Sequence, residues 1–151
     1  MTAGPGLGVV GVGIDLVDVL RLREALGRRP RMEERLFSAV ERRYSAGFVD
    51  PWPRLAARLA AKEAVMKALG VGLGAIGFTE MEIRNQPGGA PRLVLRGRAA
   101  RLAAESGVSQ WRCSLTHTST MAEAVVVALG GPQAAPSAGA GGWAHLGSPV
   151  G

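Results

Sequence analysis

The chain has 151 residues, enough for one domain with a single hydrophobic core. Its hydrophobic content of 47% and charged content of 20% are those of a globular protein and exclude disorder throughout. The formal net charge of +6 favours an anionic partner: a nucleic acid, a membrane surface, a phosphorylated cofactor or an acidic protein. Aromatic residues make up only 5% of the chain, which argues against a nucleic-acid site built on base stacking.

The sequence also bears on compartment and domain boundaries. One cysteine, Cys113, precludes an intrachain disulfide and is typical of a reducing compartment. We see no signal peptide, and no uncharged apolar run approaches the ~18 residues of a membrane span. We therefore expect a cytoplasmic protein without membrane contact. From Gly131 onward charged residues are absent and Gly, Ala, Pro and Ser dominate, so we expect a domain over residues 1–130 and a flexible tail over 131–151.

The first element expected is a β-branched strand, Val9–Ile14, which ends at Asp15. Leu16 begins a helical spacing of apolar residues that continues to Leu26, and Gly27 is a typical helix stop. Asp15 is thus expected at the junction, where its side chain either projects into a site or caps the helix. Six arginines follow, and their density indicates a binding face for an acidic partner: Arg21, Arg23, Arg28, Arg29, Arg31 and Arg35.

The longest predicted helix runs from Arg54 to Gly70, where the glycine suits the position after the last helical residue. Lys62 lies on its apolar stripe, and we expect the ammonium to reach past the edge of the core. Glu63 and Lys67 lie a quarter-turn away on a floor of alanines. They form either an exposed i,i+4 ion pair or one side of a trough that another segment fills. The stripe consists of Leu55, Leu59, Met66 and Leu69.

The other elements are shorter. Ser38 and Glu41 have the spacing of a capping box that opens a helix. All elements together predict an α+β domain in which a small antiparallel sheet packs against the long helix. After that helix we expect a strand at Thr79–Arg84, a turn at Pro87–Pro91, a strand at Arg92–Leu95, a helix at Arg98–Ser106, and strands at Trp111–Leu115 and Glu123–Leu129.

Several common kinds of site have no counterpart in the sequence. It contains no Cys/His cluster for zinc, no Walker loop and no nucleophile elbow. Asp15 and Glu63 could share a magnesium ion, with substrate phosphates completing its coordination. His117, predicted in a polar loop, could donate to phosphate, transfer protons or be a plain loop residue. Cations available to neutralise phosphate charge are Arg58, Lys62, Lys67 and His117.

Three separated stretches resemble the motifs of the holo-acyl-carrier-protein synthases, the small 4′-phosphopantetheinyl transferases. Each stretch alone could arise by chance, but their common order and spacing are highly specific. The match extends from about Val9 to Leu129. The stretches are Gly13-Ile14-Asp15 with Arg21; Ala60–Ala64 with Lys67, Ala68 and Gly70; and Ser114–Thr118 with Ala122 and Ala124.

The resemblance implies a reaction. A member of this family moves 4′-phosphopantetheine from coenzyme A to a serine of an apo acyl carrier protein, requires Mg²⁺ and releases adenosine 3′,5′-bisphosphate. It implies fatty acid or polyketide biosynthesis as the setting, and a homotrimer with sites between subunits. By the same resemblance, Asp15 and Glu63 bind Mg²⁺ and act with Lys67 in catalysis; Arg58, Lys62, Lys67, His117 and Thr118 bind coenzyme A; and Arg21, Arg28 and Arg31 face the acidic carrier.

Two alternatives to an enzyme remain open at this stage. One is a basic module that binds RNA or DNA, supported by the net charge and weakened by the scarcity of aromatic residues. The other is a protein that only docks carrier proteins through residues 21–35. For the enzyme, Glu63 and a metal-bound water are both candidate general bases.

Overall fold

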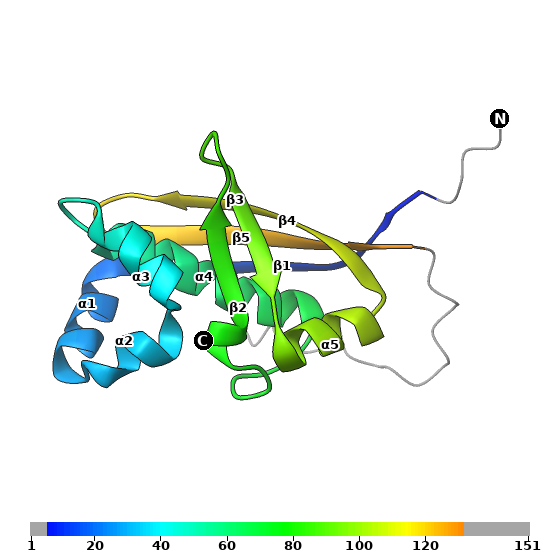
Figure 1. Ribbon diagram of the computed structural model, residues 1–151, viewed down its shortest axis with the longest axis horizontal. Helices are drawn as coiled ribbons and strands as arrows, with labels where there is room; N and C mark the ends of the chain where they lie inside the picture. Colours follow the sequence, from blue (N-terminus) through cyan, green and yellow to red (C-terminus); the bar gives the residue numbers. More distant parts are fainter. Residues whose placement is uncertain (1–5, 132–151) are drawn as a thin grey trace, which may run out of the picture.

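The computed structural model describes residues 6–131 of the chain. The predicted tail therefore lies outside the described residues, except for Gly131. Helices and strands follow one another largely in the predicted order (Figure 1). They are β1 (Gly8–Asp18), α1 (Val19–Arg28), α2 (Arg31–Leu36), α3 (Ala39–Ala46), α4 (Trp52–Leu69), η1 (Phe78–Glu80), β2 (Met81–Asn85), β3 (Pro91–Leu95), α5 (Gly97–Glu105), β4 (Val108–His117) and β5 (Met121–Gly130).

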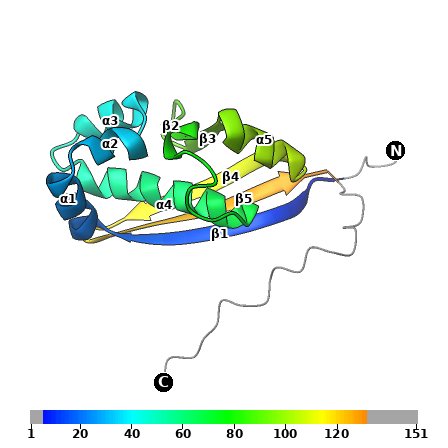
Figure 2. The same cartoon turned by 90° about the horizontal axis from the view of Figure 1, so that it is seen from below.

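The strands form two antiparallel sheets, which confirms the predicted α+β class. The main sheet has the strand order β1-β5-β4, and β2 pairs with β3 in a separate hairpin. At one end of the main sheet, Gly8 is paired with Gly130. Figure 2 shows that the helices lie on one side of this sheet, with α4 directly against it. No helix within residues 6–131 is long and apolar enough to cross a membrane.

Helix α4 is buried on nearly all sides because it lies between the sheet and the outer elements. The alanine face from Ala56 to Ala68 is buried together with the predicted apolar stripe, so the single-stripe prediction was too narrow. Strand β1 fills the trough along these alanines. Its glycines permit the close approach, since a Cβ at Gly13 would lie 1.8 Å from the carbonyl oxygen of Ala64, and one at Gly11 would lie 2.0 Å from that of Ala68.

The opening strand is longer than predicted, and the following helix begins later. The expectation that Asp15 marks the junction and Leu16 begins the helix is wrong, because both residues lie within β1. Asp15 faces α4, whereas Leu16 points to the opposite side in the alternation of a strand. The helix begins at Val19. Its N-cap is Asp18, whose carboxylate accepts a 2.8 Å hydrogen bond from the backbone N–H of Arg21.

The other predicted boundaries agree with the structure to within a few residues. The capping box of Ser38 and Glu41 opens α3, and Gly70 follows α4 in the left-handed conformation with φ of 68°. The strand predicted from Thr79 begins later, because the chain first makes the single turn η1. Strands β4 and β5 are longer than predicted, so His117 is the last residue of β4 instead of a loop residue.

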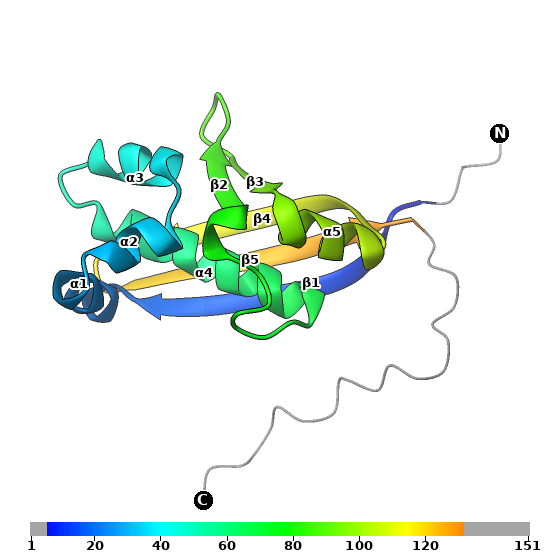
Figure 3. The ribbon, with the colours of Figure 1, turned by 60° about the horizontal axis from the view of Figure 1, so that its bottom comes forward.

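The face of the main sheet turned away from α4 is not covered by any described element (Figure 3). On β1, the side chains of Val12, Ile14 and Leu16 are 50%, 54% and 59% exposed. In the antiparallel register, Val12 lies opposite Val127 of β5 and Ile14 lies opposite Val125. We call these five residues the outer strip. An exposed apolar surface of this kind is typical of a contact with another protein.

Candidate active site

Asp15, Glu63 and Lys67 meet where β1 crosses α4. The Lys67 ammonium donates a 2.8 Å hydrogen bond to Asp15 Oδ1 and another of 2.8 Å to the carbonyl oxygen of Ile14. The ion pair of Lys67 therefore joins the helix to the strand. The Asp15 side chain is 11% exposed, whereas that of Lys67 is 56% exposed. The lysine thus presents its charge to solvent above a largely buried carboxylate.

The Asp15 carboxylate is close enough to Glu63 to affect the ionisation of that residue. Burial and the adjacent Asp15 together raise the pKa of Glu63 to about 7, although the Lys67 ammonium acts in the opposite direction. Asp15 Oδ2 is buried and has no hydrogen-bond partner among the described residues. Two adjacent acids with an unsatisfied oxygen fit a divalent cation, and Mg²⁺ commonly takes one or two protein carboxylates. No group of three or more His, Cys, Asp or Glu side chains suited to a metal occurs within residues 6–131.

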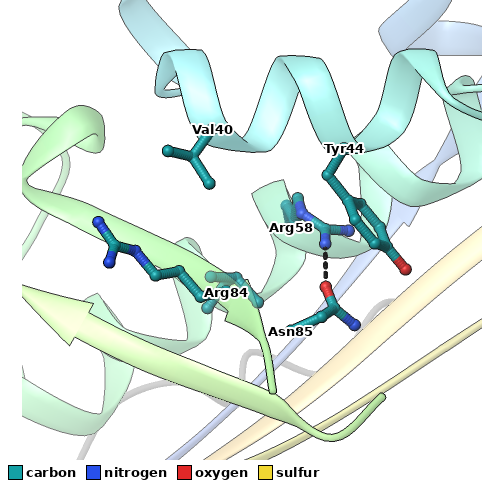
Figure 4. A pocket seen from close by; sticks show the side chains of 6 residues that line it. Val40, Tyr44, Arg58, Arg84 and Asn85 are labelled. Carbon is teal, nitrogen blue, oxygen red and sulfur yellow. Dashed lines mark hydrogen bonds between the residues drawn. The ribbon is translucent and has the colours of Figure 1, made fainter. Parts of the chain in front are cut away.

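A second polar region lies between α3, α4 and the β2–β3 hairpin. A cavity of about 190 Å³ there is lined by Tyr44, Arg54, Arg58, Asn85 and His117, among others. We call these five residues the arginine pocket. Figure 4 shows the adjoining cavity, of about 300 Å³, which shares three of them. Two guanidinium groups and an imidazole around one cavity are suited to binding an anion such as phosphate.

Arg58 is held rigidly in this pocket. Its Nη2 donates a 2.6 Å hydrogen bond to Asn85 Oδ1, and its guanidinium carbon lies 4.2 Å from the centroid of the Tyr44 ring (Figure 4). Burial lowers the pKa of Arg58, while Glu41 and Tyr44 act in the opposite direction. Its Nε is buried without a partner among the described residues. Arg54 is fixed in the same way, 3.4 Å from the ring centroid of Phe48.

The family is decided by comparison with known proteins. The model of the 4′-phosphopantetheinyl transferase superfamily matches residues 11–128. The chain belongs to this superfamily. The resemblance drawn from the three sequence motifs is therefore confirmed. The protein is an enzyme of the holo-acyl-carrier-protein synthase family.

Relatives and solved structures agree with this placement. The holo-[acyl-carrier-protein] synthase of Moorella thermoacetica is 44% identical, over 76% of this chain and 90% of its own. The holo-[acyl-carrier-protein] synthase of Caldanaerobacter subterraneus is 39% identical, over 80% of this chain and 94% of its own. The structure of Helicobacter pylori holo-[acyl-carrier-protein] synthase in complex with coenzyme A has a TM-score of 0.68 at 29% identity, over 78% of this chain and 98% of that one.

In this transferase the Lys62 ammonium does not reach the edge of the core, and that expectation is wrong. Its side chain is completely buried, and Nζ lies 2.6 Å from both the carbonyl oxygen of Leu36 and Glu41 Oε2. Burial lowers the pKa of Lys62, and the Glu41 carboxylate opposes this effect. A side chain without exposed surface makes no contact with a ligand at the surface. The predicted coenzyme A contact of Lys62 is therefore corrected to a contact within the protein.

His117, Thr118 and the predicted carrier-binding arginines of the transferase are exposed. His117 is exposed at the end of β4 and lines the arginine pocket. Thr118 is exposed in the turn before β5, where its Oγ1 accepts hydrogen bonds from the backbone N–H groups of Thr120 and Met121 at 3.2 and 3.1 Å. The six arginines of residues 21–35 are all exposed on α1, α2 and the segment between them.

Sequence reasoning missed four residues that shape this transferase: Glu41, Tyr44, Arg54 and Asn85. Glu41 was interpreted only as part of a capping box, a role it has in addition to its contact with Lys62. Tyr44, Arg54 and Asn85 belong to no motif singled out in the sequence. Their roles depend on how three elements pack around one cavity. A pattern along the sequence does not indicate which elements pack together.

Proposed function

We propose that this protein transfers 4′-phosphopantetheine from coenzyme A to a serine of an apo acyl carrier protein in a Mg²⁺-dependent reaction. Adenosine 3′,5′-bisphosphate is the second product. The observation that carries this proposal is the meeting of Asp15, Glu63 and Lys67, which come from stretches about 50 residues apart. The substrates follow from the relatives, which are named for this reaction, and from the neighbouring structure that contains coenzyme A.

The reaction breaks one bond at the phosphorus that carries the pantetheine arm and forms one to the serine oxygen. Asp15 and Glu63 would hold Mg²⁺, which, when bound, acts as a Lewis acid and template for the diphosphate. Lys67 is exposed and cationic, and we propose that it stabilises the negative charge that builds up on the diphosphate. The serine must lose a proton, and Glu63 and a water held by the metal are both candidates to accept it.

We assign the binding of coenzyme A to the arginine pocket together with Lys67 and Thr118. Coenzyme A carries a diphosphate and a 3′-phosphate, so it needs several cations. Arg58 and His117 line the pocket, and Arg54 adds a third group that the sequence motifs did not include. Figure 4 shows the Arg58 guanidinium between Tyr44 and Asn85. This arrangement orients the guanidinium before a ligand arrives, which reduces the entropy lost on binding.

The carrier would bind to the arginines of α1 and α2, with Arg21, Arg28 and Arg31 as contacts. Acyl carrier proteins are acidic, and complementary charge accelerates the encounter of two proteins. We call the six arginines of residues 21–35 the arginine surface; its first member, Arg21, lies in the first turn of α1, which begins four residues after Asp15. A carrier serine bound here would approach Asp15 from the end of the strand.

We further propose a homotrimer with active sites between subunits, acting in the cytoplasm in fatty acid or polyketide biosynthesis. The outer strip supports the oligomer, since burial of apolar side chains stabilises association. The cysteine usage of the sequence supports the compartment. The pathway follows from the carrier substrate.

One assay tests the proposed function. Incubation of the protein with apo acyl carrier protein, coenzyme A and Mg²⁺ should increase the mass of the carrier by one phosphopantetheine group. Glu63→Gln should abolish the transfer while leaving the circular dichroism spectrum unchanged, because the change removes a charge and not core volume. A matched control is Glu105→Gln, an exposed acid at the end of α5. Absence of transfer to each of several carriers, or full activity of Glu63→Gln at limiting Mg²⁺, would contradict the proposal.

A further inference from the structure

The carboxylate of Glu41 connects three elements inside the protein. Its side chain is fully buried. Oε2 accepts a 2.6 Å hydrogen bond from the Lys62 ammonium of α4 and a 2.9 Å bond from the backbone N–H of Ser38, the N-cap of α3. Oε1 accepts a 2.9 Å bond from the backbone N–H of Ile83 in β2. One carboxylate therefore fixes α3, α4 and β2 relative to one another.

Each of these three elements also supplies one residue of the arginine pocket close to the carboxylate. Tyr44 follows it by three residues on α3, which is about one helical turn. Arg58 precedes Lys62 by four residues on α4. Asn85 follows Ile83 by two residues on β2, so both side chains lie on one face of the strand. Each of these three pocket residues is thus about one helical turn, or two strand residues, from a residue that forms or contacts the buried carboxylate.

The contacts within the pocket depend on this arrangement. Arg58 reaches Asn85 over 2.6 Å and lies 4.2 Å from the ring centroid of Tyr44, although the three residues belong to different elements (Figure 4). A shift of α3 or β2 along α4 would separate them. We propose that Glu41 and Lys62 are positioning residues, which set the affinity for coenzyme A by fixing the arginine pocket without touching the ligand. This inference depends on the proposed function.

A purely structural role accounts less well for a charged pair in this place. Burying two charges carries a large desolvation cost, and replacing a buried ion pair with apolar residues of similar volume is often neutral or stabilising. Leucine and methionine would therefore avoid the desolvation cost of the two charges. They would not supply the acceptor for the N–H group of Ile83, which joins β2 to α3, nor the ammonium that joins α4 to the Glu41 carboxylate of α3.

The double variant Glu41→Leu/Lys62→Met separates the two roles. It removes both charges, so neither is left unpaired in the core. The N–H groups of Ser38 and Ile83 and the carbonyl oxygen of Leu36 each lose a partner, so we expect a folded protein with a lower unfolding midpoint than the wild type. We expect the Kd and KM for coenzyme A to rise roughly tenfold or more, as is typical when groups that orient a site are removed. The kcat at saturating coenzyme A and the KM for the carrier protein should change little. Calorimetric titration with coenzyme A and steady-state kinetics give these values.

The control is Glu34→Gln/Arg42→Gln, which removes the partly exposed ion pair between α2 and α3, 3.7 Å apart. It should leave the Kd for coenzyme A unchanged. A folded Glu41→Leu/Lys62→Met variant with the wild-type Kd overturns the inference, as does an equal loss in the control. If the double variant does not fold, Glu41→Gln at low temperature takes its place, with the same expected rise in Kd. Wild-type protein that binds coenzyme A without transferring it contradicts the proposed function alone, whereas absence of binding contradicts both.

Discussion

The backbone of Gly13 lies against that of Ala64 so closely that a Cβ on the glycine would be 1.8 Å from the alanine carbonyl oxygen. No rotamer change relieves this contact, because the backbone fixes the position of the Cβ and the alanine carbonyl oxygen is itself a backbone atom. Strand β1 carries Asp15 two residues later, so the contact also determines how far that carboxylate lies from α4. The glycine thus links the packing of the sheet to the geometry of the catalytic residues.

Gly13→Ala should therefore destabilise the protein by about 3 kcal/mol and reduce transfer activity, because β1 must move away from α4. The control is Gly27→Ala in α1, where a Cβ meets nothing within 4 Å. That change should be neutral or stabilise the protein by up to about 1 kcal/mol, since alanine is the better helix former. Urea unfolding followed by circular dichroism measures both effects. Equal stabilities of the two variants would show that the strand tolerates the side chain.

The arginine surface should act on the carrier protein and not on coenzyme A. Arg28→Ala/Arg31→Ala is expected to raise the KM for the carrier by about tenfold at low salt, because it removes charges that accelerate the encounter. Rising ionic strength should narrow the difference from the wild type. Arg101→Ala, an exposed arginine of α5 at the other end of the molecule, is the control (Figure 1). An unchanged carrier KM in the double variant would exclude this surface as the docking site.

The outer strip should hold the proposed trimer together. Ile14→Asp places a charge in the middle of this apolar surface, and burying an unpaired charge is costly, so we expect monomers. Val49→Asp changes a fully exposed apolar residue between α3 and α4 and should leave the trimer intact. Sedimentation velocity distinguishes the two outcomes. A trimeric Ile14→Asp variant would mean that subunits associate through another surface.

The acid stability of the protein should depend on Glu82. Burial raises the pKa of this carboxyl group, but hydrogen bonds from Ser38, Arg84 and Arg96 outweigh burial and lower the pKa to about 2. A carboxyl group with a lower pKa in the folded state stabilises the protein above its unfolded pKa of about 4.5. This stabilisation is lost as the pH falls from about 4.5 through about 2. The wild type should therefore lose stability over this range.

Glu82→Gln lacks this pH-dependent contribution, so its unfolding free energy should decline less between pH 4.5 and pH 2 than that of the wild type. The exposed Glu105→Gln variant should follow the wild-type curve. Parallel curves for Glu82→Gln and the wild type would show that the hydrogen bonds of Glu82 are equally strong with a protonated acid.

Local chemistry and the three motifs predicted much of this fold. Gly70 and the capping box at Ser38 act within a few residues of their positions, so the sequence alone indicated them. The motifs brought Asp15 and Glu63 together because family resemblance carries long-range information. Leu16 was wrongly assigned to the helix because its spacing to later leucines suits a helix. Its position also fits the alternation of side chains along β1, and the strand is what forms. The buried state of Lys62 depends on a partner 21 residues away, which periodicity along one helix does not reveal.

The pairing of Gly8 with Gly130 brings the beginning of β1 and the end of β5 together as neighbours. A short linker between them would convert these strands into a hairpin, and new termini could be opened at Gly88, a turn glycine whose Cβ position is empty. Such a circular permutant would preserve every element that supplies a catalytic or pocket residue. The order in which the elements leave the ribosome would change, because α5 and β4 would be made before β1. The folding rate of the permutant would therefore show whether β1 must pack against α4 before the other elements do.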